Sequence, residues 1–166
     1  MKARILSSMV AISAMYVSAD ALAVTQMSGG AGHCMAENYN DQYYISPGPG
    51  GGGWIGNNVR TMWLRCGLPV SSTTTTVSTK AGIGSSGSGA IACTRTVYYT
   101  TTGGIRTSIA TTKNITPSST PSVIQTIDFG SVTPPNSGTT SRMVADLACY
   151  FPSTSNSIIY WIENTY

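Results

Sequence analysis

The sequence predicts an all-β protein: an antiparallel β-sandwich of about seven strands, stapled by disulfides. Three observations lead to this prediction. Apolar residues recur at every second position in several runs, which is the pattern of strands with one buried face. Clusters of Gly, Pro, Asn and Ser separate these runs, and no convincing helix follows the first residues. Four cysteines, an even number, are available for pairing.

The first residues predict a secretory signal peptide over 1–23. Lys2 and Arg4 give a basic start, an uncharged and mainly apolar run follows over 5–17, and Ala21 and Ala23 form a small-x-small cleavage site. That run is shorter than the roughly 20 residues that a membrane-spanning helix needs. We therefore expect a secreted bacterial protein, periplasmic or extracellular, with no membrane span in its mature chain.

The cysteines predict two disulfides, because an oxidising compartment lets them form and persist. Four cysteines allow three connectivities. We favour Cys34–Cys66 and Cys93–Cys149, since the last two lie in similar apolar runs that could be neighbours in a core. The sequence holds no Cys-x-x-Cys and no pair of histidines, so we expect no metal site.

The mature chain is predicted to form one domain with two parts. Residues 24–58 are irregular and rich in Gly and Tyr, and the Pro and Gly run over 47–53 is read as a mobile surface loop. Residues 59–166 form the body of the sandwich. Its first strand follows 59, where Met62, Leu64 and Cys66 alternate with polar or exposed positions.

The next elements follow in chain order. Residues 73–79 are β-branched hydroxyl residues with one valine, which suits an exposed or edge strand. Residues 81–89 are read as a loop of Gly and Ser. A longer strand then presents one apolar face, with Arg95 as its one misfit; that face consists of Ile91, Cys93, Val97 and Tyr99.

The second half of the body contains a hairpin and three strands. Gly103 and Gly104 lie between alternating runs and predict a tight turn, because such turns need positive φ. Residues 123–132 form a strand with Val123, Ile127 and Phe129 on one face. Residues 143–151 alternate throughout, and a final strand carries Ile158, Tyr160 and Ile162.

Short ordered motifs resemble a loose group of small exported bacterial proteins with four cysteines. In that group an early cysteine precedes a Cys-x-x-Pro segment, and a later Cys-x-x-Pro precedes a short terminal strand. Here these segments are 66–69 and 149–152, with Cys34 as the early cysteine. The resemblance implies export and disulfides, and it implies no activity.

Composition excludes several classes of function. Nine Lys and Arg with a net charge of +3 are too few for a surface that follows nucleic-acid phosphates. A catalytic triad needs a histidine, and the only one, His33, lies in a glycine-rich segment. Asp128 and Asp146 lie opposite apolar faces, so paired carboxylate catalysis is not expected. We predict a protein that is not an enzyme and takes no cofactor.

Aromatic side chains are the candidate ligand-binding residues. Planar rings on a rigid sheet can stack against sugar rings, while hydroxyl and amide side chains supply hydrogen bonds. The alternative is that the rings pack against the sheet faces. Trp63 lies opposite the Met62–Leu64 face; the predicted ligand-binding set is Tyr43, Tyr44, Trp54 and Trp161.

These features favour a secreted, non-enzymatic binding or interaction module, with a polysaccharide or another exported protein as its partner. The first alternative is a structural subunit of an extracellular matrix or fibre, because the strand at 73–79 has no Lys or Pro to block edge pairing. A second alternative is an inhibitor that presents the loop 45–54 to the cleft of an exported enzyme.

Overall fold

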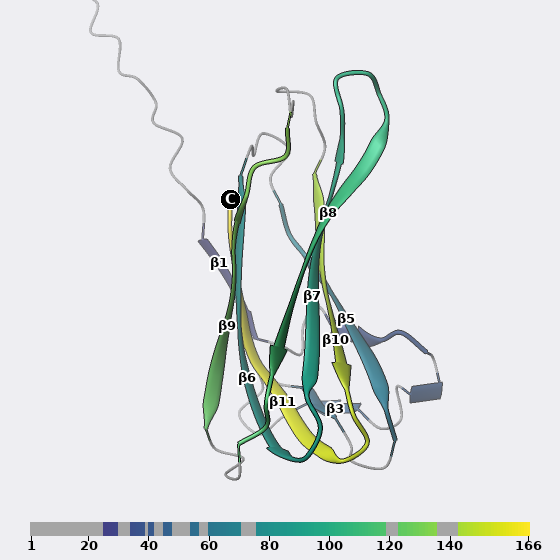
Figure 1. The fold of residues 1–166 in the computed structure, drawn as a ribbon, viewed down its shortest axis with the longest axis vertical. Coiled ribbons are helices and arrows are strands. Elements are labelled where there is room, and N and C mark those ends of the chain that lie inside the picture. Colours follow the sequence, from purple (N-terminus) through teal and green to yellow (C-terminus); the bar gives the residue numbers. More distant parts are fainter. Residues whose placement is uncertain are drawn as a thin grey trace, which may run out of the picture.

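Eleven β-strands form two antiparallel sheets that pack as a sandwich (Figure 1). The structure is a computed structural model and describes residues 25–29, 34–38, 40–41, 45–47, 54–56, 60–70, 76–118, 123–135 and 143–166. The predicted sandwich is confirmed. The predicted signal peptide lies outside the described residues. Among the described residues, no helix has the length and apolar character to cross a membrane.

One sheet has five strands. In spatial order they are β2 (Cys34–Ala36), β5 (Met62–Leu68), β10 (Val144–Phe151), β7 (Ile91–Thr100) and β8 (Arg106–Ile115). β7 and β8 form the predicted hairpin, with Gly104 at a φ of 79°. Its tip projects beyond the other strands at the top of Figure 1.

The other sheet has six strands. They are β3 (Ile45–Pro47), β4 (Trp54–Gly56), β11 (Ser155–Thr165), β6 (Val77–Gly87) and β9 (Ile124–Val132), with β1 (Thr25–Gly29) paired to β11. Strands β1 to β4 fall within 24–58 and were not predicted. Each has only three to five residues, too few to reveal a period of two.

The alternating patterns correctly identify the inner faces of three strands. Leu64 and Cys66 of β5, Leu147 of β10, and Val97 of β7 are all completely buried. The predicted inner position of Val123 is wrong, because it precedes β9 and is 47% exposed, whereas Ile127 and Phe129 are buried as expected.

The predicted disulfides Cys34–Cys66 and Cys93–Cys149 are both present. Each joins residues that lie directly opposite one another on neighbouring antiparallel strands, β2 with β5 and β7 with β10. Both bonds therefore lie on the inner face of the five-stranded sheet. They hold its strands together pairwise and do not bridge the two sheets.

The prediction of a loop over 81–89 is wrong. Residues 81–87 belong to β6, which lies inside the six-stranded sheet between β11 and β9. The prediction of an edge strand over 73–79 is also wrong for 77–79, which belong to the same inner strand. Thr79 is fully buried, and its hydroxyl donates to Asn164 Oδ1 at 2.9 Å. Residues 73–75 lie outside the described residues. Ser85 and Ser157 share a buried hydrogen bond of 2.9 Å, so neighbouring strands satisfy this polar sequence.

The final strand also differs from its predicted pattern. A register irregularity between Ile159 and Trp161 changes the alternation within β11. Of the predicted set of Ile158, Tyr160 and Ile162, only Ile162 is buried. The other buried position is Ile159. The bulge turns the indole of Trp161 to the outer face of the sheet, over Gly82.

Arg95, the misfit of the apolar strand, lies fully buried between the sheets. Its Nη1 donates to the carbonyl oxygen of Gly130 in β9 at 2.6 Å, and its Nη2 donates to Thr111 Oγ1 in β8 at 3.1 Å. Gly130 has a φ of 68°, a left-handed conformation that favours glycine. Arg95 therefore connects the two sheets through a hydrogen bond.

Candidate functional site

The outer face of the five-stranded sheet carries a continuous set of aromatic, hydroxyl and charged side chains. The register aligns them in rows across the strands. The first row contains Trp63, Tyr150, Ala92 and Asn114. The next two rows are Arg65, Ala148, Thr94 and Thr112, then Gly67, Asp146, Thr96 and Ala110. The last two rows are Val144, Tyr98 and Ser108, then Thr100 and Arg106.

An aromatic pair occupies one end of this face. Trp63 of β5 and Tyr150 of β10 lie opposite one another, with ring centroids 5.2 Å apart and planes inclined at 59°. Trp63 is 42% exposed although it is a large apolar side chain. Tyr150 supports its ring from the neighbouring strand. The pair thus presents a supported aromatic surface to solvent.

Small side chains occupy the middle of the face. Gly67, Ala148 and Ala110 leave space between the aromatic end and the larger side chains at the other end. Thr94 and Thr112 share a hydroxyl–hydroxyl hydrogen bond of 2.8 Å. We call these middle rows the strip: a part of the sheet face rich in threonine hydroxyls, between the aromatic pair and the larger side chains at the other end.

A charged group borders the aromatic pair. Arg65 Nη2 lies 3.0 Å from Glu37 Oε1, and Arg65 Nε lies 3.9 Å from Asp146 Oδ2. Burial raises the pKa of Asp146, while the Arg65 guanidinium and a hydrogen bond from Thr96 oppose that rise and the Glu37 carboxylate adds to it. Arg65 therefore holds two carboxylates beside Trp63.

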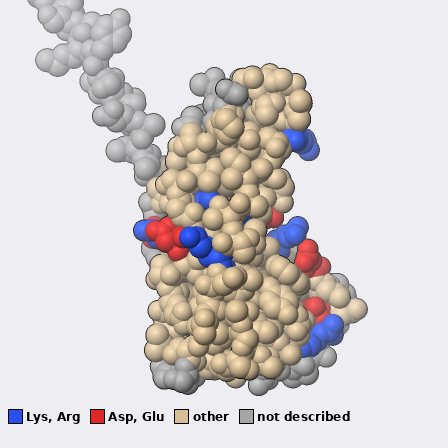
Figure 2. Space-filling view, in the orientation of Figure 1, with Lys and Arg blue, Asp and Glu red and all other residues tan. Residues whose placement is uncertain are grey.

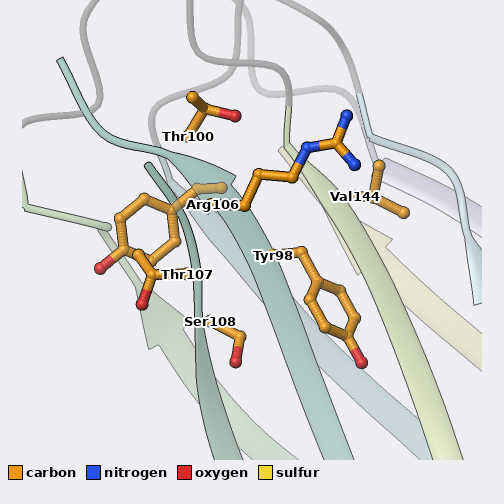
Figure 3. Close-up of a pocket in the computed structure, with 7 residues that line it drawn as sticks. Tyr98, Thr100, Arg106, Thr107, Ser108 and Val144 are labelled. Carbon is orange, nitrogen blue, oxygen red and sulfur yellow. The ribbon is translucent and has the colours of Figure 1, made fainter. Parts of the chain in front are cut away.

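A pocket of about 680 Å³ lies at the opposite end, beside the turn of the β7–β8 hairpin. Its lining residues are Tyr98, Tyr99, Thr100, Arg106, Thr107, Ser108 and Val144. In Figure 3 the Arg106 side chain extends across the strands toward Val144, above the ring of Tyr98, and Thr107 points the other way. Tyr98 is 44% exposed and Val144 is 60% exposed. The pocket combines one cation, several hydroxyl groups and an accessible ring.

Most of the surface seen in Figure 2 is uncharged, and the Lys, Arg, Asp and Glu side chains on it form a few small groups. Among the described residues, no three His, Cys, Asp or Glu side chains group in a way that could hold a metal ion. His33 lies outside the described residues. The chemistry available on this face is therefore that of stacking, hydrogen bonding and single charge pairs.

The described part of the chain contains two of the four predicted ligand-binding residues, Trp54 on β4 and Trp161 on the neighbouring strand β11. Tyr43 and Tyr44 lie outside it. Trp54 is placed only by its backbone, opposite Ile159 in the register of β4 with β11. Trp161 lies on the six-stranded sheet, partly buried over Gly82. Its environment matches the alternative in which the ring packs on a sheet face.

Of the aromatic pair, only the outward orientation of Trp63 could be predicted from the sequence. Trp63 could be recognised as facing away from the core because Met62 and Leu64 flank it. Its partner Tyr150 lies 87 positions later, and only the register of β5 with β10 brings the rings together. Arg106 gave no signal, because it is a single basic residue after a turn.

The sequence matches no protein-family model, and no curated protein is similar to it. Several solved structures are similar to it. One is the Clostridium thermocellum endo-1,4-β-D-xylanase 10B with its CBM22-1 and GH10 modules, at 10% identity and a TM-score of 0.48, covering 86% of this chain and 24% of that one. A second is the xylan-binding module CBM15, at 8% identity and a TM-score of 0.46, covering 86% and 96%.

A third similar structure is the mosquito-larvicidal Cry4Aa toxin of Bacillus thuringiensis. Its identity is 13%, its TM-score is 0.51, and the match covers 84% of this chain and 23% of the toxin. This chain therefore spans about a quarter of the length of the xylanase and of the toxin. At 13% identity the similarity to the toxin concerns the fold alone: the chain is an antiparallel, disulfide-containing β-sandwich.

Proposed function

We propose that this protein is a secreted, non-enzymatic binding module that holds a polysaccharide chain on the outer face of its five-stranded sheet. The observation that carries the proposal is the exposed aromatic pair of Trp63 and Tyr150 at one end of a hydroxyl-lined strip. A solvent-exposed tryptophan that a second ring supports offers a flat apolar surface, which suits the apolar face of a sugar ring.

The surroundings of the pair fit this role. Threonine hydroxyls along the strip can donate and accept hydrogen bonds, as sugar hydroxyls require. Arg65 with its two carboxylates adds charged hydrogen-bonding groups beside the ring. Apart from Glu37, which follows β2, these groups lie on β-strands, so binding would order few additional side chains.

Export is part of the proposal. The signal peptide over 1–23 would direct the chain out of the cytoplasm, and both disulfides would then form in an oxidising compartment. Catalysis is not proposed, because the composition offers a single histidine and few acidic residues.

The test is a binding assay on mature protein that has been exported from its full precursor. Affinity electrophoresis against a panel of soluble polysaccharides, followed by calorimetry, gives the affinities. We expect Trp63→Ala to weaken binding at least tenfold while the melting temperature changes little. Ile124→Ala is the matched control, since Ile124 is 45% exposed on the other sheet. Failure of the parent protein to bind any glycan would overturn the proposal.

The same assay distinguishes the second candidate site. If Tyr43, Tyr44, Trp54 and Trp161 form the binding surface, Trp54→Ala and Trp161→Ala will abolish binding and Trp63→Ala will not. The inhibitor alternative, through the loop 45–54, also stays a proposal, because 48–53 lie outside the described residues. Both alternatives predict that the outer face of the five-stranded sheet can be altered without consequence.

A specific observation keeps the fibre alternative in view. In the described part of the chain β8 pairs only with β7, so the other edge of a ten-residue strand is open. A fibre subunit would add a strand there in place of the 73–79 segment that the sequence favoured. Light scattering of the mature protein decides: a polymer series that Ala110→Pro abolishes supports the fibre, and a monomer rejects it.

A further inference from the structure

Arg106 is a cation without an ion pair among the residues that the structure describes. The other arginine on this face, Arg65, is held between Glu37 and Asp146. Arg106 lies on β8, two rows beyond Asp146 in the register, with only Tyr98, Ser108 and Val144 in the row between. Its charge is therefore uncompensated at the end of the strip.

The pocket around Arg106 is suited to an oxyanion on a sugar. A guanidinium presents its N–H donors in a planar fork that matches a carboxylate in two parallel hydrogen bonds. In Figure 3 Thr100 lies on the same side as the guanidinium, whereas the hydroxyls of Tyr98 and Ser108 point away from it, where they can bind hydroxyls of a neighbouring sugar unit. The exposed ring of Tyr98 supplies an apolar surface beside the charge.

The pocket and the aromatic pair can contact one chain. Val144 and Tyr150 are six residues apart on β10, which corresponds to about 20 Å along an extended strand. The rows between them contain Gly67, Ala148 and Ala110 beside the charged pair of Arg65 and Asp146. A polysaccharide of several sugar units could thus stack one unit on Trp63 and place a later unit in the pocket.

We infer that the ligand is an acidic polysaccharide and that Arg106 binds the carboxylate of a uronic acid unit. This inference rests on the proposed function, since it names the class of glycan that the same face selects. A carboxylate fits better than a neutral sugar because a neutral ligand would cover Arg106 without supplying a partner for its charge.

The test compares matched glycans. Polygalacturonate, alginate and glucuronoxylan are titrated beside the same polymers after chemical reduction of their carboxyl groups, with a sulfated galactan as a second anion. We expect at least one uronate polymer to bind about tenfold more tightly than its reduced form. Arg106→Gln should remove that preference, so that the acidic polymer and its reduced form bind with equal affinity.

Two further variants distinguish the effect of the planar guanidinium of Arg106 from the effect of the protein's net charge. Lys113→Gln removes one charge from the same strand, at an exposed position outside the pocket, and should leave the preference intact. Arg106→Lys keeps the charge without the planar fork and should retain only part of the preference. These results together would assign the carboxylate to the Arg106 guanidinium.

The outcomes distinguish the inference from the proposed function. Equal, Trp63-dependent binding of acidic and reduced polymers would overturn the inference and leave the binding face intact. A preference for the sulfated galactan over all uronates would also overturn it. If the parent protein binds none of the polymers, neutral forms included, both the inference and the proposed function fail.

Discussion

The indole of Trp161 lies directly over the backbone of Gly82. The two residues are paired across β11 and β6, and a Cβ on Gly82 would overlap the Cε2 and Nε1 atoms of the indole. Gly82 is buried for this reason, although it faces outward. An aromatic ring that covers a cross-strand glycine compensates for the missing side chain in the middle of a sheet.

Gly82→Ala is expected to destabilise the protein, because its methyl group forces the indole away from the sheet. We expect a loss of about 1–3 kcal/mol, the range for overpacking in a well-packed site. Urea unfolding measures the loss, and tryptophan emission reports the displaced ring. Gly67→Ala is the control, since a Cβ at Gly67 meets no atom within 4 Å. Equal stability of the two variants would contradict the packing role of Trp161.

Arg95 should be more sensitive to truncation than to replacement by a residue of similar length. Arg95→Ala leaves both a cavity and an unpaired Gly130 carbonyl, and we expect it to cost about 3–5 kcal/mol. Arg95→Met fills much of the space that Arg95→Ala leaves empty. It also removes a guanidinium whose pKa is lowered by burial, so Arg95→Met should lower the free energy of unfolding clearly less than Arg95→Ala does. Denaturant unfolding gives both values; equal losses for Ala and Met would show that the lost guanidinium contacts, and not the cavity, account for the cost.

The two disulfides should contribute similar stability but different local order. Loops of 32 and 56 residues predict about 4 kcal/mol each, with the longer loop about 0.5 kcal/mol ahead. The three-residue strand β2 pairs only with β5 in the described part, so Cys34→Ala with Cys66→Ala should expose it to proteolysis below the unfolding transition. Cys93→Ala with Cys149→Ala should instead lower global stability, because β7 and β10 also pair over seven positions. Limited proteolysis with mass spectrometry distinguishes the two, and early cleavage of β7 or β10 would contradict this assignment.

The raised pKa of Asp146 predicts that the stability of the protein depends on pH. Because burial raises its pKa in the folded state, the folded protein holds this proton more tightly than the unfolded chain. Its contribution is therefore most favourable below the ordinary value of 3.8 and is lost as pH rises through the raised folded pKa. Asp146→Asn removes the titrating group and with it this loss. The melting temperature of the variant minus that of the parent should therefore increase between pH 3.5 and pH 7.

The hydroxyl of Thr96 provides a second check on this group. Its hydrogen bond lowers the pKa of Asp146, so Thr96→Val should move the titration of the carboxyl to still higher pH. NMR of the carboxyl carbon measures the midpoint in both proteins. A midpoint at or below the ordinary aspartate value in the parent protein would show that burial does not dominate at this site.

Local patterns in the sequence predict the sandwich class, the inner faces of β5, β7 and β10, and the β7–β8 hairpin, whose loop contains Gly104 at positive φ. These patterns are a period of two and turn chemistry. The similar apolar runs around Cys93 and Cys149 favoured their pairing, although four cysteines leave three connectivities open. Arg95 was visible as a misfit, although its partner Gly130 was not.

The tertiary structure alone decided where the outward side chains meet. Residues 81–87 have the composition of a loop and become a central strand, because Trp161 covers Gly82 and Ser157 binds Ser85. Trp63 meets Tyr150, and Arg106 reaches the end of the same strip, only through the register of strands distant in sequence. No local pattern encodes that register, since a shift of two residues preserves every inward and outward position while changing every neighbour across the sheet.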